Sequence, residues 1–163
     1  MILIPYQRKD AKNYARRWAF SRNPAYYAFD KIGGDCTSFI SQCIYAGAKV
    51  MNYTPTFGWY YINSTNRSPS WTGVEYLYNF LTTNTGVGPF AEEVLSERQL
   101  EIGDVIQLGN SEKYYHSLLV VGMNRFNIFV AAHDDNAYMR NLSTYRFQRA
   151  RFLHIQGVRK EPA

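Results

Sequence analysis

Residues 33–47 read Gly-Gly-Asp-Cys-Thr-Ser-Phe-Ile-Ser-Gln-Cys-Ile-Tyr-Ala-Gly, and this stretch decides the fold that we expect. Its apolar residues recur three and four positions apart, which is the pattern of a helix with one buried face. Asp35 is a residue type favoured at helix N-caps, so the helix should begin at Cys36. The two glycines permit a sharp turn into the helix. The sequence therefore predicts a buried helix whose first residue is a cysteine.

A cysteine in this position lies where a helix carries partial positive charge and unpaired N–H groups. Both features favour the thiolate, and the N–H groups can stabilise an oxyanion when the thiolate attacks an acyl carbon. Cys43 falls in the middle of the apolar face and is expected to be an inert buried residue. The motif alone leaves open whether Cys36 is also only structural.

The remaining pattern predicts an α+β domain with helices packed on an antiparallel sheet. Two further helices are expected, the first over residues 6–20, before the break at Asn23-Pro24, and the other from Val74 to about Leu81. Residues 51–70 have no clear period and indicate a long loop. The second half is rich in β-branched and aromatic residues separated by short turns, which predicts a meander of hairpins. The expected strands are residues 105–108, 115–122, 127–132 and 147–158.

Histidines supply the base that a reactive thiol needs. His116 opens one predicted strand and His133 closes the next, so an antiparallel pairing would place both at the same rim of the sheet. A nucleophile, a base and a third polar group that orients the base form a catalytic triad. His154 has no evident partner in the sequence and is expected to be structural.

Composition limits the classes of function. With 163 residues, 46% hydrophobic and 19% charged, the chain should form one domain over residues 1–163. The net charge of +5 comes from scattered residues, so nucleic-acid binding is not expected. The two cysteines match neither a disulfide framework nor a zinc motif, and no metal or cofactor is expected. No apolar run approaches a membrane span, and the N-terminus lacks a signal-peptide pattern. We therefore expect a monomer that is either cytoplasmic or has lost a leader.

The motifs together resemble those of papain-like amidohydrolases, which include NlpC-like cell-wall peptidases and CHAP amidases. The closer resemblance is to the bacterial putative amidase domain family. Motifs along most of the chain carry this resemblance: Tyr26-Tyr27, the run from Gly33 to Gln42, Ser70-Trp71-Thr72, Gly103-Asp104-Val105-Ile106, His116-Ser117 and Ala132-His133-Asp134-Asp135. Ser38 departs from the family pattern, in which asparagine is expected.

The resemblance implies a metal-free cysteine amidase that cleaves an amide bond, often in peptidoglycan or a related peptide. It implies Cys36 as nucleophile, His116 as base and His133 as the third catalytic residue, with Asp135 as the alternative. Candidates for the walls of a substrate groove are Asp35, Trp59, Tyr60 and Trp71, although the aromatic residues suit a packed core equally well. The alternative function is a non-catalytic module of the same fold that binds cell-wall glycan or peptide.

Overall fold

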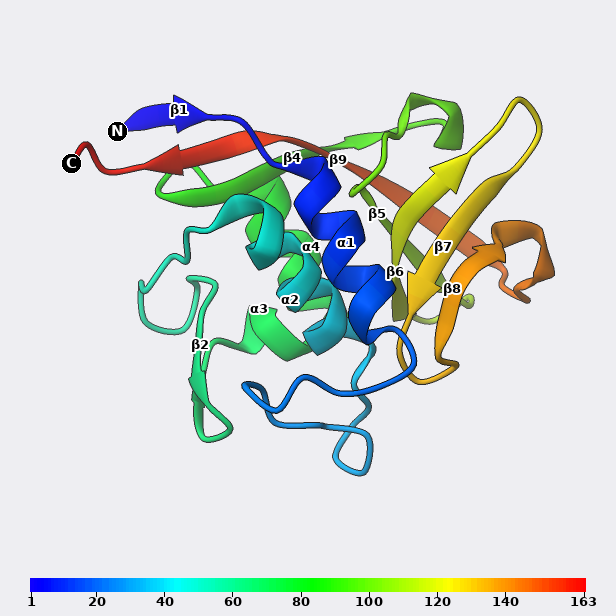
Figure 1. Cartoon of the computed structure of the whole chain (residues 1–163), viewed down its shortest axis with the longest axis horizontal. Helices are drawn as coiled ribbons and strands as arrows, with labels where there is room; N and C mark the ends of the chain where they lie inside the picture. Colours follow the sequence, from blue (N-terminus) through cyan, green and yellow to red (C-terminus); the bar gives the residue numbers. More distant parts are fainter.

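The computed structural model describes all residues, 1–163, as helices packed on a curved antiparallel sheet (Figure 1). The helices are α1 (Arg8–Trp18), α2 (Cys36–Ala48), α3 (Pro69–Thr72) and α4 (Val74–Thr83). The strands are β1 (Ile2–Ile4), β2 (Tyr61–Asn63), β3 (Asn66–Arg67), β4 (Gly88–Val94), β5 (Val105–Gly109), β6 (Tyr114–Met123), β7 (Ile128–Ala132), β8 (Ala137–Asn141) and β9 (Arg149–Lys160). None of the helices combines the length and the apolar character needed to cross a membrane.

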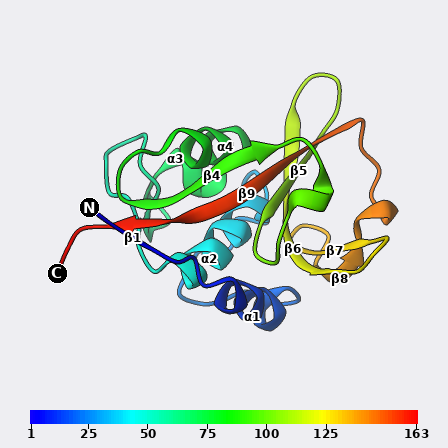
Figure 2. The same ribbon diagram turned by 90° about the horizontal axis from the view of Figure 1, so that it is seen from above.

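Strand β9 holds the main sheet together. One edge of β9 pairs with β4 along most of its length, and the other pairs with β5 and then with β1. From β5 the sheet continues through β6 and β7 to β8, all antiparallel. Figure 2 shows β9 running across the molecule, with β5 to β8 at one end and both chain termini at the other. The helices lie against one face of this sheet, and α2 packs against β6 and between α1 and α3.

Two apolar clusters form the core. The larger cluster fills the space between the helices and the sheet and includes Phe39, Ile40 and Ile44 of α2. The smaller one lies on the opposite face of the curved sheet, around Leu118 and Val120 of β6. Burial at this scale stabilises the domain by roughly 25 cal/mol per Å² of apolar surface. Because α2 is buried along nearly its whole length, its N-terminus is fixed relative to the sheet.

Asp104 closes the gap that remains along β9 between β5 and β1. Its carboxylate is fully buried and accepts hydrogen bonds from the Arg8 guanidinium at 2.7 Å and from the Ile155 N–H at 2.9 Å. The same carboxylate contacts Nδ1 of His154 at 2.7 Å. These bonds tie the start of α1 to the sheet, and they give His154 the structural partner that was not evident in the sequence.

The predicted α+β class and the main elements agree with the structure. Helix α2 begins at Cys36, and α4 and the strands β5, β6, β7 and β9 lie within about two residues of the predicted limits. The predicted loop at residues 51–70 is wrong in part, because it contains the hairpin of β2 and β3 and the start of α3. Strands β1, β4 and β8 were not predicted. Strand β4 contains Pro89 and Glu92, β8 contains Arg140, and β1 has only three residues. The pairing of β1 and β4 with the distant strand β9 is not visible in the local pattern.

Gly47 marks a close contact between α2 and the residues before α1. A Cβ atom at this position would lie 2.6 Å from the Tyr6 ring and 2.7 Å from the Gln7 carbonyl oxygen. We expect Gly47→Ala to lower the free energy of unfolding by about 1–3 kcal/mol, because the backbone must shift to relieve the overlap. Urea unfolding checks this, with Gly86→Ala as the control, since the nearest atoms there lie at 3.5 Å. Equal stability of the two variants would contradict the close contact.

Candidate active site

Cys36 is the first residue of α2, as expected, and only 7% of its surface is exposed. The first hydrogen bond of the helix runs from the Phe39 N–H to the Asp35 carbonyl at 3.0 Å. The N–H groups of residues 36–38 therefore precede the intrahelical ladder and have no acceptor within the helix. The thiol thus lies at the positive end of a buried helix, beside N–H groups that can bind an anion.

His116 lies beside this thiol. It is near the start of β6, and its side chain is 13% exposed. A ring nitrogen of His116 lies within 4.8 Å of the Cys36 sulfur. The Nε2 atom of His116 lies 3.4 Å from Oδ1 of Asp135, so Nδ1 is the ring nitrogen without a carboxylate partner.

The charges around His116 favour its protonated form. Burial of the ring acts to lower the pKa, but contacts with Asp135 and Cys36 outweigh it and raise the pKa of His116 from 6.5 to about 9. Burial acts to raise the pKa of Asp135, but hydrogen bonds with His116 and Tyr145 dominate and lower the pKa to about 2. The raised pKa of His116 therefore depends on its two neighbours, the Asp135 carboxylate and the Cys36 sulfur.

Asp135 is itself held by two neighbours. Arg140 donates to its Oδ2 atom at 2.9 Å, and the Tyr145 hydroxyl also donates to Oδ2. Arg140 further stacks on the Tyr145 ring at 3.7 Å. These contacts occupy one carboxylate oxygen and leave the other toward His116. Sequence reasoning missed Arg140 and Tyr145, which follow Asp135 by five and ten residues without any motif.

The turn between β7 and β8 connects Asp135 to the start of α2. Asp134 accepts a hydrogen bond from the Asp35 N–H at 2.8 Å. Asp134 and Asn136 have positive φ angles of 77° and 41°, a conformation that Asp and Asn tolerate better than most residues. A Cβ atom on Gly34 would approach the Asp134 carboxylate to 2.7 Å, so this close approach requires glycine.

The structure does not bring His133, the predicted third residue of the site, against His116. The Nδ1 atom of His133 lies 2.6 Å from Oδ2 of Asp35, and its Nε2 lies 2.8 Å from the Trp18 carbonyl oxygen. The ring stacks on Phe39 with centroids 3.8 Å apart. Both ring nitrogens are thus occupied in a buried position. The alternative candidate, Asp135, is the residue that lies against His116.

Asp35 also differs from its expected roles. It occupies the N-cap position, but its side chain makes no capping bond and instead accepts from the Phe29 N–H at 2.9 Å and contacts His133. Only 1% of its surface is exposed, so it cannot line a groove. Trp59 and Trp71 are fully buried and belong to the core, which leaves Tyr60, half-buried, as the one groove candidate at the surface.

A hydrogen bond joins the neighbours of the two reactive residues. The Thr37 hydroxyl lies 3.0 Å from the Ser117 hydroxyl, and both residues are buried. Thr37 follows Cys36 on α2, and Ser117 follows His116 on β6. The bond therefore fixes the position of the helix end along the strand, and with it the distance between thiol and imidazole.

One further carboxylate approaches the pair. Ligand atoms of Cys36, His116 and Asp134 all lie within 4.8 Å of one another, a spacing that a cation could bridge. The Asp134 carboxylate already accepts the Asp35 N–H, however, and His116 faces Asp135 through its second nitrogen. These bonds match a thiol–imidazole–carboxylate site in which Asp134 supports the backbone.

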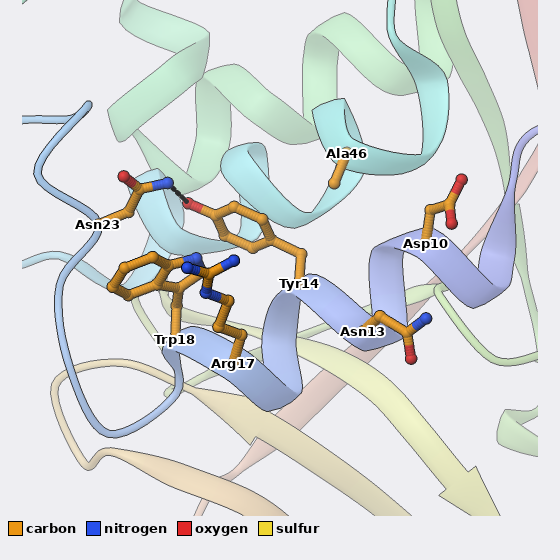
Figure 3. Close-up of a pocket in the computed structure, with 7 residues that line it drawn as sticks. All are labelled: Asp10, Asn13, Tyr14, Arg17, Trp18, Asn23 and Ala46. Atoms are coloured by element: carbon orange, nitrogen blue, oxygen red, sulfur yellow. Dashed lines mark hydrogen bonds between the residues drawn. The ribbon is translucent and has the colours of Figure 1, made fainter.

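A cavity of about 470 Å³ on the outer side of α1 is a separate feature (Figure 3). Figure 3 shows Arg17 lying over Trp18, with the Asn23 amide donating to the Tyr14 hydroxyl at 3.2 Å. The residues that line it are Asp10, Asn13, Tyr14, Arg17, Trp18, Asn23 and Ala46. None of them is a cysteine or a histidine, so the candidate nucleophile and base lie elsewhere.

Comparisons with known proteins identify the family to which the chain is similar. A family model described as "Putative amidase domain" matches residues 5–156. The chain is 34% identical over 127 residues to the uncharacterized protein YhbB of Bacillus subtilis (strain 168). The aligned residues make up 76% of the chain. The matched region is 39% of the length of YhbB, so the chain spans well under half of this relative. No solved structure matches the chain.

His133 is expected to stabilise the fold rather than to tune His116. We expect His133→Ala to lower the free energy of unfolding by about 3–5 kcal/mol, because it leaves the Asp35 carboxylate buried without its main partner. Urea unfolding followed by tryptophan fluorescence measures this. His154→Ala is the control and should cost less, because its partner Asp104 keeps Arg8 at 2.7 Å. A stable His133→Ala protein in which only the titration of His116 changes would favour a catalytic role instead.

Asp135 is expected to control the charge of His116. In Asp135→Asn, loss of the carboxylate disfavours the imidazolium, so the pKa of His116 should fall from about 9 toward 6.5. Because the folded-state pKa is raised, protonated His116 stabilises the wild type fully below pH 6.5, and this contribution disappears as the pH rises through 9. NMR titration of labelled histidines checks this, with the His154 signal as an internal control. An unchanged midpoint for His116 would contradict the contact.

Proposed function

The chain belongs to the putative amidase domain family, and from this premise we propose that it is a cysteine amidohydrolase with a papain-like fold. The proposed nucleophile is Cys36, the general acid–base is His116, and the residue that orients His116 is Asp135. The observation that carries the proposal is the approach of a helix-terminal thiol to an imidazole whose other nitrogen faces a carboxylate. The order of these groups along the chain, helix, then strand, then strand end, supports the papain-like assignment.

In the proposed reaction, His116 first takes the proton of the Cys36 thiol, which gives a thiolate beside an imidazolium. The Cys36 thiolate attacks the carbonyl carbon of a substrate amide, and the resulting oxyanion accepts hydrogen bonds from N–H groups at the start of α2. His116 donates its proton to the leaving nitrogen as the C–N bond breaks, which releases an amine and leaves a thioester on Cys36. Neutral His116 then takes a proton from water, which attacks the thioester and releases the carboxylic acid and the thiolate.

The residues around the pair have supporting roles in this scheme. Asp135 orients the ring of His116 and stabilises its positive charge. Asp35, Asp134 and His133 hold the helix start and the β7–β8 turn together, so they position the reacting groups without touching the substrate. The scheme uses no metal ion and no cofactor.

The substrate class follows from the resemblance to cell-wall amidohydrolases. We propose a peptide amide of the kind present in peptidoglycan. The alternative, a module that binds cell-wall glycan or peptide without cleaving it, differs in a measurable way, because it does not require a reactive Cys36.

Cys36→Ala is expected to abolish hydrolysis. Purified muropeptides digested with the wild type should give products with new amine and carboxyl ends by mass spectrometry, and Cys36→Ala should reduce the rate by at least about 10³-fold. The digestion is run in EDTA so that a contaminating metallopeptidase does not contribute. Cys43→Ala is the matched control and should keep the activity, because Cys43 is fully buried and its burial raises the pKa of the thiol well above the usual range.

Alkylation tests the thiol without a substrate. Iodoacetamide at pH 6 should modify Cys36 faster than it modifies an unstructured cysteine peptide, and His116→Ala should remove the difference. Peptide mapping separates Cys36 from Cys43. Labelling of Cys36 no faster than the peptide, together with unchanged muropeptides, would reject the hydrolase and favour the binding module.

A further inference from the structure

A second cavity, of about 490 Å³, lies where the hairpin of β5 and β6 meets the starts of β9 and α4. Figure 2 shows this hairpin projecting from the sheet beside the start of β9. The cavity is lined by charged residues and one tyrosine: Glu75, Glu112, Lys113, Tyr114, Arg149 and Arg151. Five of these six residues carry a charged side chain.

Tyr114 organises the cations of this cavity. Arg149 stacks on the Tyr114 ring at 4.3 Å, and Arg151 stacks on it at 3.9 Å. The ring reaches across β5 because its register partner is Gly109, where a Cβ atom would lie 3.0 Å from the ring. A bulge in the pairing of β5 and β6 at this point sets the direction of Tyr114. The two guanidinium groups are therefore held in place before any ligand arrives.

The two arginines differ in how their charge is compensated. Arg151 is 7% exposed, donates to Gln107 at 2.9 Å and pairs with Glu75 at 2.9 Å. Arg149 is exposed and makes neither an ion pair nor a hydrogen bond to the protein. A guanidinium that stacks flat on a ring keeps its N–H edge free, and that edge matches the two oxygens of a carboxylate. Arg149, with Lys113 beside it, is thus a preformed donor for an anion.

The cavity is connected to the candidate active site through a buried polar row. Arg151, Gln107 and Ser117 are cross-strand neighbours on β9, β5 and β6. Gln107 donates to Ser117 at 3.2 Å, and Ser117 contacts Thr37, the residue after Cys36. On β6, Tyr114 and His116 lie on either side of the bulge, where their partners on β5 are Gly109 and Leu108. The cavity therefore adjoins the start of the strand that carries His116, and the polar row through Ser117 connects it to the start of α2.

We propose that this cavity is a subsite that binds a carboxylate group of the amide substrate, with Arg149 as its main donor. The proposal rests on the proposed hydrolase function and names the substrate class more narrowly, as an amide compound that bears a free carboxylate near the bond to be cleaved. Three cationic and two acidic side chains line the cavity, so its charge suits one carboxylate and not a polyanion such as nucleic acid. Glu75 and Glu112 also exclude extended anionic chains.

Direct binding tests the subsite without requiring turnover. The probes are N-acetyl-trialanine, which ends in a carboxylate, and its C-terminal amide, each titrated into the Cys36→Ala protein and followed by NMR. We expect the carboxylate peptide to bind at least tenfold more tightly than the amide, with Arg149→Gln removing the preference. Arg125→Gln is the matched control, because Arg125 is also exposed and stacks on an aromatic ring, Phe126 at 5.4 Å, in a different turn. Equal binding of the two peptides, or a preference that survives Arg149→Gln, would overturn the proposal.

Protection of Cys36 tests whether the cavity belongs to the same cleft. In the wild type, the carboxylate peptide should slow alkylation of Cys36 by iodoacetamide at least threefold, and in Arg149→Gln it should not. Carboxylate binding that leaves the alkylation rate unchanged would place the cavity outside the cleft and reject its assignment as a substrate subsite. These readings do not depend on hydrolysis, so failure of the Cys36→Ala digestion and failure of the subsite remain distinguishable.

Discussion

The rest of the site depends on the attachment of the first turn of α2 to the turn between β7 and β8. The Asp35 N–H donates to Asp134, and the Asp35 carboxylate pairs with His133 in a buried position. Without these two bonds, the hydrogen bond between Thr37 and Ser117 would be the main directional contact between the end of the helix and the sheet. Directional bonds at this junction place the thiol within reach of the imidazole. The buried Asp35–His133 hydrogen bond contributes little net stability on its own, but it excludes alternative positions of the helix end.

Residues of the same type have different roles around this junction. Some stabilise the fold, and others lie in the candidate active site. His133 and His154 each pair with a buried aspartate and lie within the framework. His116 alone faces both a thiol and a partly exposed carboxylate. Environment thus distinguishes three histidines that are equivalent in the sequence. It also distinguishes two cysteines on one helix, since Cys36 lies at the positive end and Cys43 lies in the apolar core.

Much of the fold and part of the candidate site could be predicted from the sequence, at positions where the local pattern determines the structure. The start of α2 followed from a cap residue and an apolar stripe, and the approach of β6 and β7 followed from a short turn. The choice between His133 and Asp135 could not be predicted, because neighbouring residues at the end of a strand point in different directions and the turn geometry decides which one faces the base. The burial of Trp59 and Trp71 could not be predicted from the sequence either, because an aromatic residue in a polar loop suits a groove or a core equally well. Tyr114 turns toward the arginines only because a bulge changes the register, and no local signal marks a bulge.

The four residues from His133 to Asn136 all contact groups fixed elsewhere in the fold. His133 and Asp134 bond to Asp35, Asp135 lies against His116, and Asn136 bonds to Arg22, which also contacts His133. Consecutive side chains that each contact a fixed group leave little freedom to add or remove a residue. A single insertion or deletion here would move every side chain to the neighbouring partner, so the length of this turn is under strong constraint even where residue identity could vary. The turn between β6 and β7 has no comparable set of partners and can change in length without reaching the site. Among related chains, differences in length should therefore occur in the turn between β6 and β7 and be absent from the turn between β7 and β8.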